Sequence, residues 1–128
     1  MSNRRVVYDE EEFADAMNDD TVDEVEIHGD IKTKMVDIKA KGDVAWAVVV
    51  ACFALCATAL ITAPATNGTS ALIATPALAP AVSAVGLAII GFLVKMVILT
   101  KSVTIVKQIY YNLKLEETCP EYIVMRKI

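Results

Sequence analysis

The sequence lacks charged residues over a long central stretch. From Val44 to Val94 there is no Asp, Glu, Lys or Arg, and all sixteen acidic residues lie before Val44 or after Leu115. About 20 apolar residues suffice to cross the ~30 Å hydrocarbon core of a bilayer. An uncharged stretch of this length is unlike an ordinary solvent-exposed segment. It predicts two membrane-spanning helices joined by a short turn.

The sequence also has little of what enzymes and metal sites use. It contains one histidine and three cysteines, and it shows no Ser/His/Asp set, Gly-rich phosphate loop or paired catalytic acids. Cys52 and Cys56 have no His or acidic neighbours, so they are predicted to be small apolar core residues. We therefore expect a protein that is not an enzyme and needs no cofactor or metal. The formal net charge of −4 does not indicate nucleic-acid binding.

The polar segment before the apolar stretch, residues 1–42, combines a helical and an alternating pattern. Asp9 and Glu12 have the spacing of a capping box, which predicts a short helix over Asp9–Met17. Apolar and polar residues alternate within Thr21–His28 and again within Met35–Ala40, which predicts two strands in a hairpin. The chain opens on basic and acidic residues, so no signal peptide is expected.

The polar segment after the apolar stretch, residues 100–128, predicts a helix and a second hairpin. Val103, Val106, Ile109 and Tyr110 fall on one helical face, although the density of β-branched residues in 102–112 leaves a strand as the alternative. Alternation then returns on either side of a turn that contains a proline. The predicted strands of this hairpin are Leu113–Glu117 and Tyr122–Arg126.

These patterns together predict a membrane protein in which a two-helix transmembrane hairpin is inserted in a small cytosolic α+β domain. That domain would contain two β-hairpins and the short N-terminal helix, because a lone hairpin is marginally stable in water. The predicted spans are 43–63 and 77–99, with an external loop over 64–76. Lys39, Lys41, Lys95 and Lys101 flank the spans, so the positive-inside rule places both termini in the cytoplasm, at a bacterial inner membrane.

Small residues recur along one face of each predicted span. Helices in lipid associate through such residues, and the simplest arrangement makes the two stripes face each other in the hairpin. Asp43 would then lie near Lys95 at the cytoplasmic end, as a structural pair or as a pore or gate. The stripes could instead face neighbouring copies. The residues of this seam are Ala47, Ala51, Ala54, Thr58, Ala81, Ala84, Ala88 and Gly91.

Three polar or aromatic residues outside the spans are candidates for a cytosolic ligand or partner surface: Glu11, His28 and Tyr111. Imidazole titrates near neutrality, so His28 could sense pH or bind a ligand, but a lone histidine at a strand end is more often structural. Tyr111 could stack on a ring or belong to the core. Glu11 belongs to an acidic region over residues 9–30 that would meet a basic partner.

Two functions follow from these patterns. The order of elements, with Asp37–Val48 leading into the helical hairpin and Tyr110–Ile128 closing the chain, resembles small bacterial two-span inner-membrane proteins. Some of those act as effectors in anti-phage defence. The resemblance implies an effector or ion channel in the lipid bilayer, a homo-oligomer gated by a cytosolic ligand or protein trigger. The alternative is an immunity or accessory membrane protein that binds a toxin or a larger membrane partner.

Overall fold

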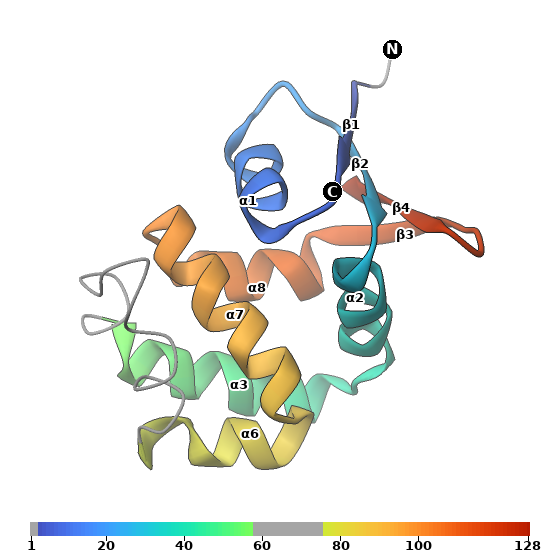
Figure 1. Ribbon diagram of the computed structural model, residues 1–128. Coiled ribbons are helices and arrows are strands. Elements are labelled where there is room, and N and C mark those ends of the chain that lie inside the picture. Colours follow the sequence, from blue (N-terminus) through green and yellow to red (C-terminus); the bar gives the residue numbers. More distant parts are fainter. Residues whose placement is uncertain (1–2, 58–75) are drawn as a thin grey trace.

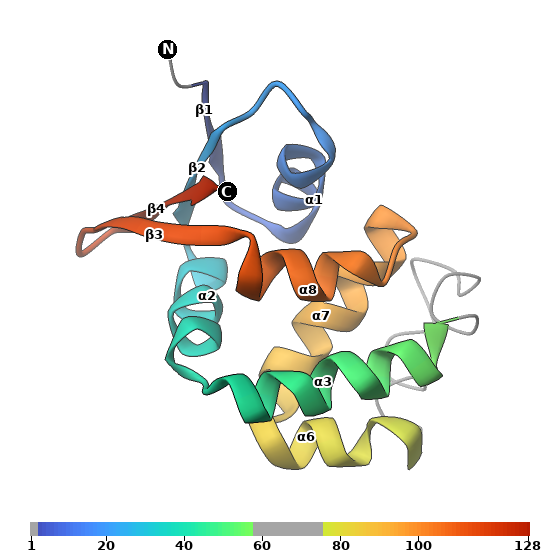
Figure 2. The same cartoon turned by 180° about the vertical axis from the view of Figure 1, so that it is seen from behind.

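A computed structural model describes residues 3–57 and 76–128, and these form a small α+β fold. Figures 1 and 2 show the sheet and α1 at one end, α3 and α6 at the other, and α7 between them. The elements are, in order, β1 (Arg4–Val7), α1 (Glu10–Asn18), β2 (Glu24–His28), α2 (Asp30–Ala40), α3 (Asp43–Leu55), the 3₁₀ helix η1 (Pro76–Leu78), α6 (Ala79–Val85), α7 (Leu87–Thr100), α8 (Thr104–Tyr111), β3 (Leu113–Thr118) and β4 (Tyr122–Lys127).

The four strands form one mixed sheet in the order β1-β2-β4-β3. β1 and β2 are parallel and are connected through α1, whereas β4 is antiparallel to both β2 and β3. Successive residues of a strand point to opposite faces of the sheet. One face therefore packs on the helices through buried side chains, which are Val7, Val25, Ile27, Ile123 and Met125.

Three of the predicted elements in the polar segments are confirmed. The predicted N-terminal helix is α1, and its capping box is present. The Glu12 amide donates to Asp9 Oδ1 at 2.8 Å, and the Tyr8 amide donates to Glu12 Oε1 at 2.8 Å. The predicted strand over Thr21–His28 is β2, and the predicted C-terminal hairpin is formed by β3 and β4.

The predicted strand over Met35–Ala40 is wrong, because these residues belong to helix α2. The buried residues of α2 are Ile31, Met35 and Ile38, spaced by four and three as on one face of a helix. The alternating pattern begins only at Met35, whereas the helical spacing of buried residues already begins at Ile31. The partner of β2 is instead β1, at Arg4–Val7, which the sequence did not predict.

The apolar stretch supplies the central helix of the fold. Helix α7 contacts α1, α2, α6 and α8, and the rings of Phe13 and Phe92 stack with centroids 6.1 Å apart. A helix that is apolar on all sides is buried either in a protein core or in a membrane. In this chain it is buried by the protein itself. Its buried residues are Ile89, Ile90, Phe92, Leu93, Val94, Met96, Val97 and Ile98.

The predicted transmembrane hairpin is contradicted by the helix lengths. Helix α7 has 14 residues and α3 has 13, so at 1.5 Å per residue each is about 20 Å long, short of a ~30 Å bilayer core. The predicted span 77–99 is divided at Gly86, and α7 ends before Lys101, which is left-handed with φ 57°. Within residues 3–57 and 76–128, no helix combines the length and hydropathy needed to cross a bilayer. This finding also overturns the inner-membrane location inferred from the hairpin.

The predicted seam of small residues does not form between the apolar helices. Helix α3 contacts α6, but the buried residues of α3 are Trp46, Val49, Cys52 and Phe53. Ala47, Ala51 and Ala54 point outward and are exposed. On the other side, Ala81 is buried, Ala84 and Gly91 are half-buried and Ala88 is exposed, while Thr58 lies outside the described residues.

Candidate functional site

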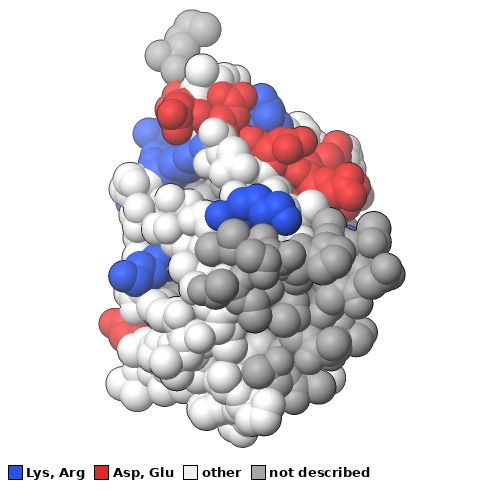
Figure 3. All heavy atoms as spheres, turned by 90° about the vertical axis from the view of Figure 1, so that its left-hand side faces the viewer, with Lys and Arg blue, Asp and Glu red and all other residues white. Residues whose placement is uncertain are grey.

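Helix α1 and the loop that follows it carry a group of exposed carboxylates, which we call the acidic surface. It consists of Glu11, Asp15, Asp20 and Asp23, all exposed. Glu11 and Asp15 are one helical turn apart and therefore share a face of α1. Figure 3, in which this side of the molecule faces the viewer, shows acidic side chains gathered over its upper part. Within the described part of the chain, none of the four has a basic group within ion-pair distance.

Other carboxylates of the same region have partners within the chain. Glu10 lies 3.6 Å from Lys34 Nζ and 3.7 Å from Lys95 Nζ. Lys95 therefore pairs with Glu10 of α1. The sequence had predicted Asp43 as its partner. Asp43 Oδ1 instead accepts from the Tyr110 hydroxyl at 2.9 Å, and this bond raises the pKa of Tyr110. The predicted pore or gate pair is therefore not assembled in this structure.

The loop after α1 is held by Asp19. Its carboxylate accepts from the Thr21 hydroxyl at 2.6 Å and the Thr21 amide at 2.9 Å, and Arg5 lies 2.6 Å away. The Thr21 bonds, together with Arg5, hold the pKa of Asp19 below its ordinary value. These contacts fix the loop that places Asp20 and Asp23 beside the end of α1.

The end of α1 is fixed from β4 by Lys127. Its ammonium donates to the carbonyls of Ala16 at 2.6 Å, Asp19 at 2.9 Å and Met17 at 3.4 Å. A cation is favoured at this position because the last carbonyls of a helix have no partner within the helix. Burial lowers the pKa of Lys127, although the acidic groups around it oppose that effect.

A hollow of about 260 Å³ lies next to the acidic surface, between the end of α1, the following loop and the end of α8. Two members of the acidic surface, Asp20 and Asp23, lie on its lining. The other lining residues differ in character, with apolar, amide and cationic groups represented. They are Met17, Val22, Gln108, Asn112, Lys127 and Ile128.

The open face of the sheet carries an aromatic stack around His28. The centroid of the Tyr8 ring lies 4.7 Å from that of the imidazole, and the centroid of the Tyr122 ring lies 5.2 Å from it. His28 Nε2 is 2.7 Å from Glu26 Oε2. A hydrogen bond with the Cys119 thiol raises the pKa of Tyr122. His28 is therefore held by two neighbouring aromatic rings and by a carboxylate at one nitrogen.

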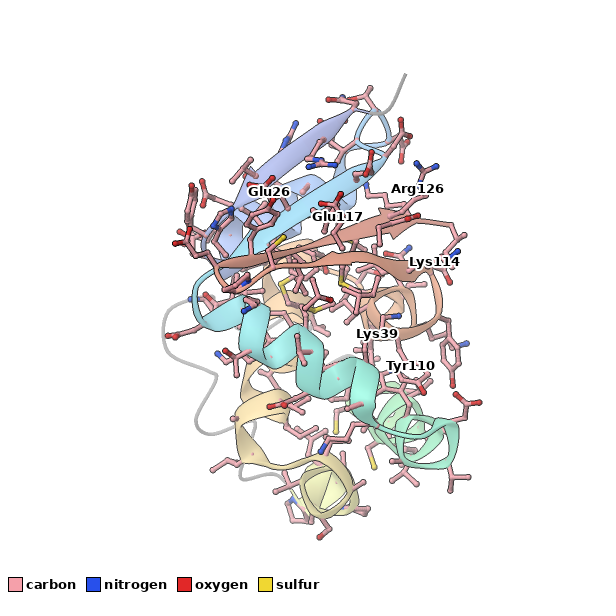
Figure 4. All side chains as sticks on the ribbon, turned by 90° about the vertical axis from the view of Figure 1, so that its right-hand side faces the viewer. Glu26, Lys39, Tyr110, Lys114, Glu117 and Arg126 are labelled. Atoms are coloured by element: carbon pink, nitrogen blue, oxygen red, sulfur yellow. The ribbon has the colours of Figure 1, made fainter. Side chains whose placement is uncertain are left out.

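Most charges on the open face are paired with one another. Arg4 lies 3.4 Å from Glu24 and 3.5 Å from Glu26, and Arg126 lies 3.1 Å from Glu116. Figure 4 views this face, with Glu26, Glu117, Lys114 and Arg126 among its residues. Because its carboxylates and guanidiniums largely satisfy each other, this face offers a partner less free charge than the acidic surface does.

A second lysine, Lys39, links α2 to the end of α8 and the start of β3. Lys39 donates to the carbonyls of Tyr110 and Leu113, and its ammonium lies 5.4 Å from the Tyr110 ring centroid. Figure 4 shows Lys39 and Tyr110 close together below the sheet. Burial lowers the pKa of Lys39. Its bonding groups are used within the fold, so Lys39 serves as a structural clamp.

The three predicted surface residues do not form one site. Glu11 is on α1, His28 is on β2 and Tyr111 is on α8, and only Glu11 belongs to the acidic surface. Tyr111 is 46% exposed and meets Tyr110 edge to face. The sequence did not identify Gln108, Asn112 or Lys127. For Lys127 a signal existed, because it continues the inward-facing positions of β4.

Comparison with known protein families shows to which family the chain belongs. A family described as "Uncharacterised protein PM1101" matches residues 6–125. The chain belongs to this family. The PM1101 match extends from β1 almost to the end of β4, so it includes the whole acidic surface and most of the hollow, but stops before Lys127. No curated protein and no solved structure matches the chain.

Proposed function

We propose that this chain is an accessory protein that binds a basic protein partner through the acidic surface. The observation that carries the proposal is the contrast between two groups of carboxylates. Glu10 and Asp19 have cationic partners within the fold, whereas Glu11, Asp15 and Asp20 have none in the described part of the chain and point to solvent.

Concentration of unpaired charge in one region has a physical consequence for binding. Like charges on one surface repel each other and destabilise the folded chain slightly, and an approaching basic surface relieves that repulsion. Complementary charge also steers encounter, so it raises the association rate more than it slows dissociation. The rest of the fold supports this use, because the sheet and Lys127 hold the end of α1 in place.

An accessory role of this kind was the alternative that the sequence suggested, and it does not require the membrane setting predicted with it. The channel hypothesis relied on a transmembrane hairpin, and the described helices are too short for one. An accessory or immunity role needs only a folded surface that recognises a partner. The proposed partner is accordingly defined by its chemistry, as a protein with a patch of lysine and arginine side chains.

The test compares two variants with the same change of charge. One is Glu11→Gln, Asp15→Asn, Asp20→Asn and Asp23→Asn. The control is Asp30→Asn, Asp37→Asn, Glu117→Gln and Glu121→Gln, which neutralises four exposed acids elsewhere. Proteins that copurify with the wild type from cells expressing it are identified, and each is then purified and tested for direct binding.

The expected result is a basic partner that binds the wild type and the control, and binds the first variant much more weakly. Binding should also weaken as salt rises, because the screening length falls from about 10 Å at 0.1 M to about 3 Å at 1 M ionic strength. A partner that binds both variants equally, with no dependence on salt, would contradict the proposal.

A further inference from the structure

The hollow beside the acidic surface has the size of a site for one side chain. Its volume is about 260 Å³, below the roughly 300–1,000 Å³ of sites that enclose whole drug-sized ligands. It is bounded by four separate parts of the chain: the end of α1, the loop before β2, the end of α8, and Lys127 and Ile128 at the end of β4. Figure 1 shows where these elements lie in the fold. Lys127 holds the end of α1 and the loop together, and the Ile128 amide donates to the Asn112 carbonyl at the end of α8 at 2.9 Å, so the walls of the hollow are fixed by bonds within the fold.

The apolar lining of the hollow suits a methylene chain. Met17 is half-buried and Val22 is 2% exposed, and both lie on the lining. Lysine and arginine carry a stem of three or four methylenes below a charged head, and they bury the stem while the head stays at a polar boundary. The hollow provides this combination, because polar groups lie on the same lining.

The polar lining suits a cationic donor. Asp20 and Asp23 contribute carboxylates, and Gln108 and Asn112 contribute side-chain amides. In the described part of the chain neither amide side chain has a hydrogen-bond partner, and Asp20 has no ion-pair partner. Carboxylate and amide oxygens all accept hydrogen bonds, and a guanidinium has five donors while an ammonium has three.

The one cation on the lining does not make this an anion site. Lys127 donates to three carbonyls at the end of α1, which uses the donors of its ammonium. An incoming anion would therefore find two carboxylates and no free charged donor. An incoming cation would find free acceptors and a negative charge at the edge of the hollow.

We infer that the hollow is an anchor pocket for a single lysine or arginine side chain of the basic partner. This inference rests on the proposed function and adds to it a specific contact. The acidic surface attracts the partner over a distance, and the hollow fixes its register by taking one side chain. Interfaces commonly concentrate their energy in such anchors, and arginine is enriched among them.

The test uses N-acetyl-arginine amide as the probe and N-acetyl-citrulline amide as its uncharged counterpart. Amide NMR spectra of the full chain are recorded as each compound is added. The arginine compound is expected to produce saturable shifts at Asp20, Asp23, Gln108 and Asn112. The citrulline compound should bind at least tenfold more weakly, because it lacks the charge that strengthens the hydrogen bonds. Equal binding of both compounds, or no saturable shift at the hollow, would overturn the inference.

Two double variants separate the hollow from the rest of the acidic surface. Asp20→Asn with Asp23→Asn should reduce arginine binding at least tenfold, while Glu11→Gln with Asp15→Asn should leave it within about twofold. Gln108→Met, which keeps the side-chain length and removes the amide, gives a second variant that leaves the loop intact. It should weaken binding about threefold or more.

The purified partner distinguishes failure of the inference from failure of the proposed function. If both double variants weaken partner binding equally, the acidic surface acts as a whole and the anchor pocket is refuted. If neither weakens it, the proposed function fails as well. Greater loss in the Asp20 and Asp23 variant supports both.

Discussion

Gly86 provides the most direct test of the fold, because it separates α6 from α7. Its φ of 94° and ψ of 157° lie in a region that only glycine occupies readily. A Cβ at this position would meet nothing within 4 Å, so a substitution acts through the backbone alone. Gly86→Ser should therefore destabilise the protein by about 1–3 kcal/mol, less a few tenths for helix capping by the serine. That loss corresponds to a melting temperature lower by roughly 3–10 °C.

Gly42→Ser is the matched control. Gly42 precedes α3 with φ −81° and ψ 164°, which any residue adopts, and a Cβ there also meets nothing within 4 Å. This variant should gain about 0.5–1 kcal/mol, because it restricts the unfolded chain and adds a capping hydroxyl. Urea denaturation followed by circular dichroism measures both. If α6 and α7 formed one continuous helix, Gly86→Ser would also stabilise, by about 0.5 kcal/mol, and the described fold would be refuted.

Three further predictions concern single side chains. Lys127→Met should destabilise the protein by about 1–3 kcal/mol in the same urea assay, because it leaves carbonyls at the end of α1 without a donor. The control is Lys107→Met on the exposed side of α8, which should change stability by less than about 0.5 kcal/mol. Trp46 is fully buried and its Nε1 donates to the Val106 carbonyl at 3.0 Å. Its fluorescence should therefore be blue-shifted and poorly quenched by acrylamide, and strong quenching of the wild type would contradict this burial. Trp46→Phe should lower the free energy of unfolding by about 1–3 kcal/mol. Hydrogen bonds from Thr21, together with Arg5, hold the pKa of Asp19 below its ordinary value in the folded protein. Its stabilising effect is therefore complete above the ordinary pKa and is lost as the pH falls through the lower, folded pKa. Asp19→Asn should flatten the acid side of the stability profile, and an unchanged profile would argue against the bonds to its carboxylate.

The polar parts of the fold could largely be predicted from the sequence, because their signals are local. The capping box of Asp9 and Glu12 defines α1 within one residue, and Pro120 marks the turn between β3 and β4. Met35–Ala40 shows where local reasoning fails. Six alternating residues matched a strand, but the longer repeat of Ile31, Met35 and Ile38 belonged to a helix, and tertiary packing made that repeat decisive.

The apolar segments could not be assigned from hydropathy alone. A helix covered mainly by protein and a helix covered by lipid have similar compositions, and α7 is covered mainly by protein although Leu87 at its start is 58% exposed. Gly86 was the residue that distinguished them, because it limits the helix to a length too short for a bilayer. The pattern of apolar residues does not show whether protein or lipid will surround the helix.

The candidate site could be predicted only in part. The excess of acids in residues 9–30 is visible in the sequence, and Glu11 is among the residues that it predicts as candidates for a partner surface. Which carboxylates are free depends on partners distant in sequence, since Glu10 pairs with Lys95 and Asp19 with Arg5. The hollow joins residues 17–23 with residues 108–128, and single-sequence patterns contain no information on such long-range contacts.

The strand order has a consequence for how the chain is made. β4 is the last of these four strands to be synthesised, yet it lies between β2 and β3. Until β4 emerges, β2 has no partner on one side, α1 lacks the ammonium of Lys127, and the apolar helices have no completed sheet above them. The fold therefore closes only after β4 has been synthesised. A nascent chain halted before Tyr122 would expose its uncharged helices and should require chaperones.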